Sequence, residues 1–133
     1  MIISGKSVAR IDQGLVVLLG VEKKDNEKKA DYLARKIANL RIFSDGNGKM
    51  NLSVLDIQGK AIVVSQFTLM ADTHKGNRPS FIQAAAPEIA SPLVDYFIQS
   101  LKSNGVGTES GKFAAEMLVK IHNNGPVAIL IDA

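Results

Sequence analysis

The side chains that could take part in bond cleavage in this sequence are hydroxyl, amide and imidazole groups. The chain has no cysteine, and none of its serines lies in a Gly-x-Ser-x-Gly elbow. His74 and His122 form no His-Glu-x-x-His motif, and each is better explained as a solvated or packed side chain. The sequence therefore offers no clear activated nucleophile and no metal site, and no cofactor is expected.

Polar groups gather where an apolar run ends. Ser65, Gln66 and Thr68 lie at the end of the run at residues 61–69, where a rigid strand could aim hydroxyl and amide groups at a substrate. Taken alone, they describe a strand that continues into a loop. The following loop, residues 71–78, is rich in cationic and amide side chains, and long polar loops often carry binding residues.

The segment Ser44-Asp45-Gly46-Asn47-Gly48 contains Asp-Gly and Asn-Gly, which supply positive φ at a tight turn. With Lys49 it also invites a phosphate-loop interpretation. That interpretation fails, because Phe43 occupies the place of the first glycine and Met50 the place of the Ser or Thr that would bind magnesium.

Strands and helices alternate along the first two thirds of the chain. The aliphatic run at residues 15–19, bounded by Gly14 and Gly20, predicts a strand buried on both faces, and the β-branched run at 61–69 predicts a second strand. Asp25 or Asn26 can cap a helix between them. Its apolar residues recur every three or four positions: Ala30, Leu33, Ile37 and Leu40.

A second amphipathic helix ends near Asn104-Gly105 and begins at either Pro87 or Ser91-Pro92, since proline suits only the first turn. Its predicted apolar face consists of Ile89, Leu93, Phe97 and Leu101.

The last part of the chain predicts strands. Residues 113–117 could be helical by propensity, but alternating apolar and polar residues favour a strand from about Met117 to His122. After a break at 123–126, residues 127–131 predict a closing strand. The order predicts one α/β domain over residues 1–133, with mixed β-sheets layered with helices on one side.

The composition is that of a globular protein, with 46% hydrophobic and 22% charged residues. Its longest apolar run, residues 14–21, falls far short of the roughly 20 residues needed to span a bilayer. The amino terminus lacks the apolar core of a secretory signal, so a cytoplasmic location without membrane contact is expected. A net charge of +3 only weakly favours a polyanionic partner.

Two segments resemble the signature motifs of the D-aminoacyl-tRNA deacylase family: Ser65-Gln66-Phe67-Thr68-Leu69 and Asn123-Asn124-Gly125-Pro126-Val127. Further segments are similar to that family in identity, order and spacing: 41–43, 48–53, 71–72, 75–81 and 86–88. The resemblance extends from about Gly14 to Asp132.

The resemblance implies the family's fold and a metal-independent homodimeric esterase. Its substrate would be the ester between a D-amino acid and the terminal adenosine of tRNA, and no DNA partner is expected. The Gly125–Pro126 bond would be cis and would reach into the active site of the other subunit. Backbone carbonyls held there could meet the α-amino group and leave no room for an L side chain.

The resemblance also implies roles for individual residues. Ser65, Gln66 and Thr68 would be catalytic, and Lys75 and Arg78 would contact tRNA phosphates. Substrate-binding residues would be Phe67, Leu69, Phe113, Met117, Asn123, Gly125 and Pro126. Among these, Phe67, Phe113 and Met117 would line the adenosine pocket, although a core role explains Phe67 nearly as well.

Thr68 has two interpretations in such an enzyme. It could be the nucleophile, or protein groups could orient the 2′-hydroxyl of the tRNA, which then assists hydrolysis. We favour the second, because no nearby sequence feature supplies a general base for Thr68.

Four features depart from the family pattern. Met1 falls after a first strand that members usually have, and Ala114, Asn124 and Ala128 replace a glycine, an aspartate and a threonine. These changes leave two alternatives open. The chain could be a relative that clears glycyl or other small misacylated tRNA, or a noncatalytic tRNA-binding dimer module.

Overall fold

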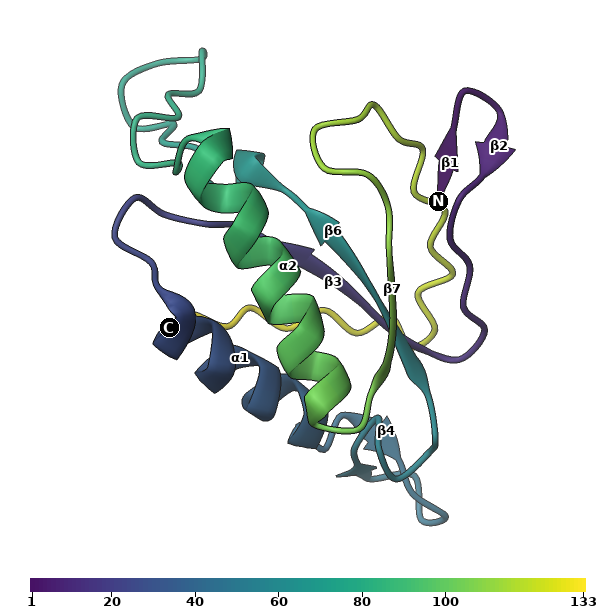
Figure 1. Cartoon of the computed structure of the whole chain (residues 1–133). Coiled ribbons are helices and arrows are strands. Elements are labelled where there is room, and N and C mark those ends of the chain that lie inside the picture. The colour runs from purple at the N-terminus through teal and green to yellow at the C-terminus, as the bar shows by residue number, and fades with distance from the viewer.

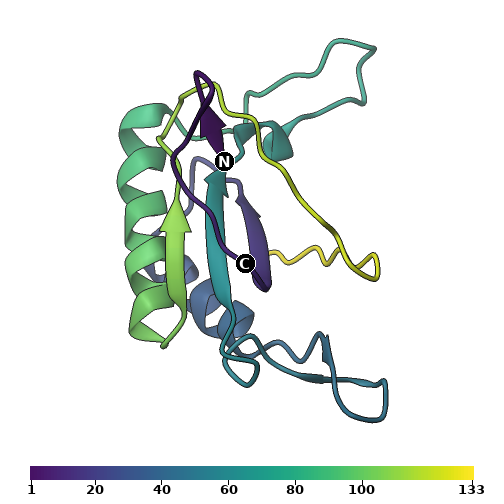
Figure 2. The ribbon, with the colours of Figure 1, turned by 90° about the vertical axis from the view of Figure 1, so that its right-hand side faces the viewer.

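A parallel three-stranded sheet lies at the centre of the structure, a computed structural model that describes residues 1–133. Its strands are β3 (Gly14–Leu19), β6 (Lys60–Ser65) and β7 (Gly107–Ser110), with β6 in the middle. The helices α1 (Glu27–Asn39) and α2 (Pro87–Ser103) cover one face, and the C-terminal segment crosses the other (Figures 1 and 2). The predicted fold class, mixed sheets with helices on one side, is confirmed.

Short elements complete the fold. Two antiparallel hairpins are formed by β1 (Ile2–Ile3) with β2 (Lys6–Ser7) and by β4 (Phe43–Ser44) with β5 (Met50–Leu52). The second hairpin closes at the predicted turn, where Asp45 Oδ1 accepts hydrogen bonds from the backbone of Asn47 and Lys49. These bonds hold the pKa of Asp45 below its ordinary value.

Alternating side chains of the central strand β6 enter two separate cores. Ala61 and Val63 face the helices and belong to a cluster of 16 buried residues. Ile62 and Val64 face the opposite side, where only Met1 and Ala9 complete a buried cluster of four. The face away from the helices is therefore sparsely covered. Accordingly, Leu18 of β3 is 44% exposed, and the prediction that this strand is buried on both faces is wrong.

The two helices form where the sequence predicted them, with some changes in their buried faces. Asn26 caps α1 by accepting a hydrogen bond from Lys29 N at 3.0 Å. Leu33 and Leu40 are only partly buried, and small residues provide the close contact instead. The buried residues of α1 are Ala30, Ala34, Ile37 and Ala38.

The helix α2 begins at Pro87, the earlier of the two predicted starts, and keeps Pro92 inside. Ile89 is 53% exposed, so its predicted place on the buried face is wrong. Phe97 and Leu101 are buried as predicted, and the other buried residues of the helix are Ala90, Val94 and Ile98.

The two strands predicted near the C-terminus, at residues 117–122 and 127–131, do not form within a single chain. Residues 117–120 alternate in burial as a strand would, whereas residues 121 and 122 are both exposed, and only Leu118 is paired, in an isolated bridge to Ile2. Residues 127–131 have no strand partner at all. Both predictions are wrong because a strand needs backbone–backbone hydrogen bonds to a neighbour, and beyond the Leu118 bridge these residues form none within the chain. The third sheet strand is instead β7, whose polar sequence Gly-Thr-Glu-Ser gave no apolar signal.

Neither helix is long and apolar enough to cross a membrane.

Candidate active site

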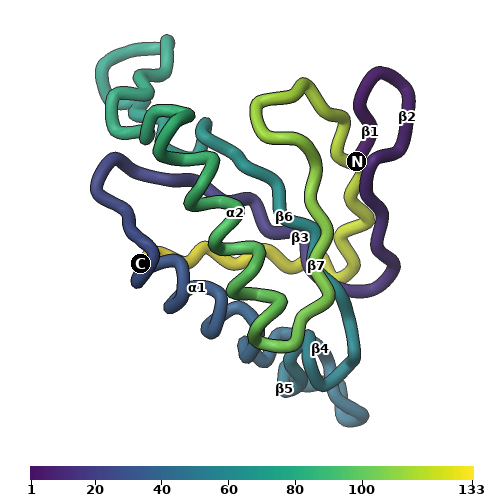
Figure 3. Tube along the Cα trace, in the orientation of Figure 1, coloured from purple at the N-terminus to yellow at the C-terminus, as the bar shows by residue number.

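The Ser-Gln-Phe-Thr-Leu segment lies at the carboxyl end of β6, where the strand becomes a 3-10 helix, η1 (Phe67–Met70) (Figure 3). The predicted strand through residue 69 therefore ends earlier, at Ser65. Gln66 N still donates to Leu19 O at 2.8 Å, and Gln66 O accepts from Leu69 N at 3.1 Å. Gln66 thus forms both the last hydrogen bond of the sheet and the first hydrogen bond of η1, and it fixes η1 to the sheet.

Gly20 allows this sharp turn to lie against the end of β3. A Cβ atom at Gly20 would stand 2.7 Å from Met70 Cε and 3.1 Å from Leu69 Cβ. The flexible Met70 methyl group could move aside, but the distance to Leu69 Cβ is shorter than nine in ten real Cβ contacts, so a side chain at position 20 would crowd the turn.

The Gln66 side-chain amide donates a hydrogen bond to the Thr68 hydroxyl. The amide thereby fixes the rotamer of Thr68 and leaves the hydroxyl proton free to be donated outward. Phe67, Thr68 and Leu69 are all exposed. No histidine or carboxylate is hydrogen-bonded to Thr68, so the geometry provides an oriented hydroxyl rather than an activated nucleophile.

Phe67 packs edge to face against Phe81, with ring centroids 5.0 Å apart and an interplanar angle of 66°. Phe67 is 57% exposed, so it is not an ordinary core residue. Its free face is available to a flat ligand such as a nucleobase. The partner, Phe81, was not singled out as a site residue from the sequence, although it ends the segment 75–81 that carries the family resemblance.

The polar loop after η1 is closed by a pair of backbone hydrogen bonds between Asp72 and Ser80, at 2.7 and 2.9 Å. Asp72 Oδ1 also accepts from the backbone N–H of His74 and contacts His74 Nδ1 at 2.7 Å. The backbone bond, followed by the side-chain bond, holds the pKa of Asp72 below its ordinary value. Lys75 and Arg78 lie exposed in this loop and form no ion pair.

The second motif lies elsewhere in the chain. The Gly125–Pro126 peptide bond is cis, with Gly125 at φ +138°, and Asn123 Oδ1 accepts a hydrogen bond from Val127 N at 3.1 Å. Asn123, Gly125 and Pro126 are exposed. A hollow of about 410 Å³ lies beside them, lined by residues 121–124.

One chain therefore does not gather all the residues singled out from the sequence. The C-terminal turn lies away from η1, on the side of the sheet opposite to the helices (Figure 2). Met117 packs against the small core and Phe113 against the large one. Beside Phe113, Ala114 adopts φ +61°, a conformation in which a Cβ atom is strained. No group of three or more His, Asp or Glu side chains is placed to hold a metal ion.

The family model described as D-Tyr-tRNA(Tyr) deacylase matches residues 1–132. The chain belongs to the D-aminoacyl-tRNA deacylase family. The predicted family, and with it the prediction of a hydrolase, are confirmed.

Individual members of the D-aminoacyl-tRNA deacylase family are similar in sequence along almost the whole chain. The D-aminoacyl-tRNA deacylase of Fervidobacterium nodosum is 53% identical over 131 residues, which are 98% of this chain and 88% of that protein. That of Dehalococcoides mccartyi strain 195 is 51% identical over 133 residues, 100% of this chain and 87% of that protein.

Two solved structures share the fold of this D-aminoacyl-tRNA deacylase family member. The c-Myc DNA Unwinding Element Binding Protein superposes with a TM-score of 0.88 at 38% identity, covering 95% of this chain and 86% of that one. A probable eukaryotic D-amino acid tRNA deacylase gives a TM-score of 0.63 at 13% identity, over 77% and 75% of the two chains. The second likeness concerns the fold alone.

Proposed function

We propose that this chain hydrolyses the ester between a D-amino acid and the 3′-terminal adenosine of tRNA, releasing free tRNA and the D-amino acid. The observation that carries this proposal is the Gln66–Thr68 hydrogen bond, presented by η1 on the exposed end of β6. It lies within a chain whose curated relatives are named D-aminoacyl-tRNA deacylases.

The chemistry that these groups support is orientation rather than covalent catalysis. The Thr68 hydroxyl, fixed by Gln66, can donate to an oxygen of the ester or to the 2′-hydroxyl of the terminal ribose. Water then adds to the ester carbonyl carbon, and the bond to the ribose oxygen breaks. The exposed face of Phe67 stacks on the adenine, and Phe113 and Met117 complete the adenosine pocket. Ser65, the last residue of β6, and Leu69 border the reacting group, while Asn123 holds the second motif by its bond to Val127 N.

We infer that the active unit is a homodimer. Four large apolar side chains of the C-terminal segment are exposed: Leu118, Ile121, Ile129 and Leu130, the last at 84%. The same segment lacks strand partners in one chain. A second copy would cover these side chains and supply the missing strand edges.

In such a dimer the Gly125–Pro126 dipeptide of one protomer approaches η1 of its partner. Its exposed backbone carbonyls accept from the substrate α-amino group, and the dipeptide occupies the space that an L side chain would need. Selection between enantiomers is then steric exclusion. Lys75 and Arg78, both exposed and without ion pairs, contact phosphates of the tRNA 3′ end.

Hydrolysis of D-tyrosyl-tRNA and L-tyrosyl-tRNA by purified protein, with a chelator present, tests the activity. Rapid loss of the D ester alone is expected. Thr68→Val should lower kcat by about 100-fold, as the loss of a positioned donor does in other enzymes. Thr73→Val, at an exposed threonine of the neighbouring loop, is the matched control and should have no effect. Equal rates on both enantiomers would refute enantiomer selection.

Mixing two inactive variants tests the shared site. Pure dimers carrying Thr68→Val should be nearly inactive. Pure dimers in which residues 125–126 are replaced by Ala-Ala should also be nearly inactive, because the replacement displaces the carbonyls that bind the α-amino group. A mixed dimer contains one intact Thr68 that faces one intact Gly125–Pro126, so activity should return on mixing. Failure to recover activity, despite exchange of protomers, would show that the dipeptide does not act on the partner's site.

The same assay with glycyl-tRNA as the substrate tests a second candidate function, the cleavage of misacylated glycyl-tRNA. Ala114 stands at φ +61° where the family pattern has glycine, and it directly follows Phe113, which is assigned to the adenosine pocket. If this methyl group redirects the substrate, glycyl-tRNA will be cleaved faster than D-tyrosyl-tRNA. Binding of tRNA without turnover of any ester would instead identify a noncatalytic module.

A further inference from the structure

A basic hollow lies on the outer face of α1 and continues past the end of the helix. It has a volume of about 380 Å³, and its walls contain three cationic side chains and no acidic one. We call it the α1 hollow, lined by Tyr32, Arg35, Lys36, Asn39, Leu40 and Arg41.

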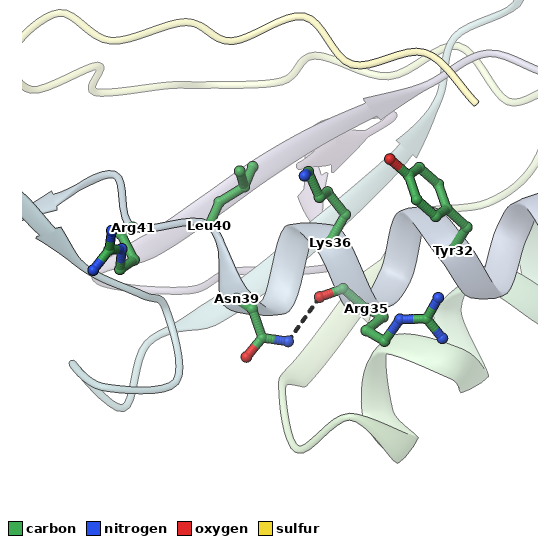
Figure 4. A pocket seen from close by; sticks show the side chains of 6 residues that line it. All are labelled: Tyr32, Arg35, Lys36, Asn39, Leu40 and Arg41. Atoms are coloured by element: carbon green, nitrogen blue, oxygen red, sulfur yellow. Dashed lines mark hydrogen bonds between the residues drawn. The ribbon is translucent and has the colours of Figure 1, made fainter.

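Two rows of side chains along α1 shape the α1 hollow (Figure 4). Tyr32, Lys36 and Leu40 follow one another at four-residue spacing on one side of the helix, and Arg35 and Asn39 form the second row. The Asn39 side-chain amide donates a hydrogen bond to Arg35 O at 2.8 Å, which holds this side chain against the helix.

The three cations have no acidic partner. None of Arg35, Lys36 and Arg41 forms an ion pair in the structure, and Arg41 only donates to the Asn51 amide oxygen at 3.2 Å. Asp31, one helical turn before Arg35, accepts from Tyr96 and Ser100 instead, at 2.8 and 2.9 Å.

Two acidic residues in the turns that follow α1 are also not paired with these cations. Asp45 and Asp56 each accept hydrogen bonds from backbone N–H groups of their own turns and form no ion pair. Three uncompensated positive charges around one hollow therefore fit an anionic ligand.

The position of the α1 hollow also bears on the ligand. The helix α1 lies between β3 and the parallel strand β6 in the chain. It ends beside the β4–β5 hairpin, near the amino-terminal end of β6, whereas η1 follows the carboxyl end of that strand (Figure 1). A favourable interaction with the C-terminal end of the helix dipole would explain the presence of Lys36, which lies in the last turn. That interaction does not explain Arg41, which lies beyond the helix, or the exposed Tyr32, which lies two turns before the end of the helix.

We propose that the α1 hollow binds the sugar-phosphate backbone of tRNA at a point remote from the aminoacyl end. This inference rests on the proposed function, because a substrate much longer than its reacting end needs a second contact. Arginine and lysine side chains neutralise phosphates, and the exposed Tyr32 ring offers a face for an unpaired base.

Binding of uncharged tRNA, followed by fluorescence anisotropy across a potassium chloride series, tests this site. The triple variant Arg35→Gln, Lys36→Gln, Arg41→Gln should bind about tenfold or more weakly, and its salt slope should fall by about two to three, as expected for three lost phosphate contacts. The control Lys6→Gln, Arg10→Gln, Lys24→Gln removes the same charge from exposed positions elsewhere and should change both values little. Thermal unfolding of each variant verifies folding.

Kinetics separate this site from the reaction centre. With D-tyrosyl-tRNA the triple variant should show a raised KM and an unchanged kcat, whereas it should cleave D-tyrosyl-adenosine at the same rate as the unaltered chain.

An unchanged tRNA affinity and salt slope in the triple variant, or an equal loss of affinity in the control variant, would overturn the proposal. Equally tight binding of a short DNA duplex would overturn the assignment to tRNA. Failure of the proposed function would appear differently, as absence of hydrolysis by the unaltered chain.

Discussion

The hydroxyl of Tyr96 on α2 donates a hydrogen bond of 2.8 Å to the carboxylate of Asp31 on α1. Ser100, one turn further along α2, donates to the other oxygen of the same carboxylate at 2.9 Å. These polar contacts link the two helices above the apolar core, and they depend on the phenol keeping its proton.

The stability of the protein should therefore depend on alkaline pH through Tyr96. The hydrogen bond to Asp31, assisted by burial and the negative charges of Asp31 and Glu27, raises the pKa of Tyr96 above its ordinary value of 10.0. Because the folded pKa lies above the unfolded one, this contribution is fully present below about pH 10 and is lost as pH rises through the folded pKa. The difference in urea midpoint between the unaltered chain and Tyr96→Phe should thus begin to shrink at about pH 10 and shrink further at higher pH. A constant difference would contradict this account.

Phe81 should affect substrate binding without touching the reacting ester. Loss of its edge-to-face contact in Phe81→Ala removes about 0.5–1.5 kcal/mol of ring positioning, and KM for D-tyrosyl-tRNA should rise roughly two- to tenfold with kcat little changed. In a double-mutant cycle, Phe81→Ala should add little to the effect of Phe67→Ala. Additive effects would show that Phe81 does not act through Phe67.

The corrected buried face of α2 can be tested by truncation. Phe97 is 1% exposed, and Phe97→Ala should lower the free energy of unfolding by about 3–5 kcal/mol. Ile89→Ala, on the same helix at 53% exposure, should change it by less than about 0.5 kcal/mol. Chemical denaturation measures both free energies of unfolding. A large decrease for Ile89→Ala would show that Ile89 is buried, either in the core or in an interface.

Ala114→Gly should stabilise the chain, because Ala114 holds φ +61°, where glycine has no Cβ strain. A gain of about 1 kcal/mol is expected from denaturant unfolding. The nearby Ala115→Gly is the matched control, since Ala115 has no positive φ, and it should destabilise or leave stability unchanged. A loss at position 114 would mean that its methyl group makes favourable contacts.

Apolar patterning predicted the elements that face the large core. The aliphatic runs became β3 and β6, and both helices formed near their predicted bounds. Ile89 was misplaced, and Leu33 is only partly buried, because helix spacing fixes the buried stripe only to within one position when small residues such as Ala34 and Ala90 provide the close contacts.

Pairing partners were less predictable than periodicity. Residues 117–122 carry the alternation of a strand, yet a strand also needs an edge to pair with, which alternation does not reveal. The polar β7 pairs with β6 because a parallel edge was free there. In the same way, motif resemblance found Gln66 and Thr68, but it did not reveal the contact between Phe67 and Phe81, which joins residues on either side of a loop.

Beyond Leu118 the backbone donates a single hydrogen bond within the chain, from Val127 to Asn123. Amide protons of this last stretch exchange with solvent unless something outside the chain protects them, whereas those of β6, bonded on both sides, open only with larger parts of the fold. Deuterium uptake at residues 119–133 thus reports directly on whether another molecule is bound there.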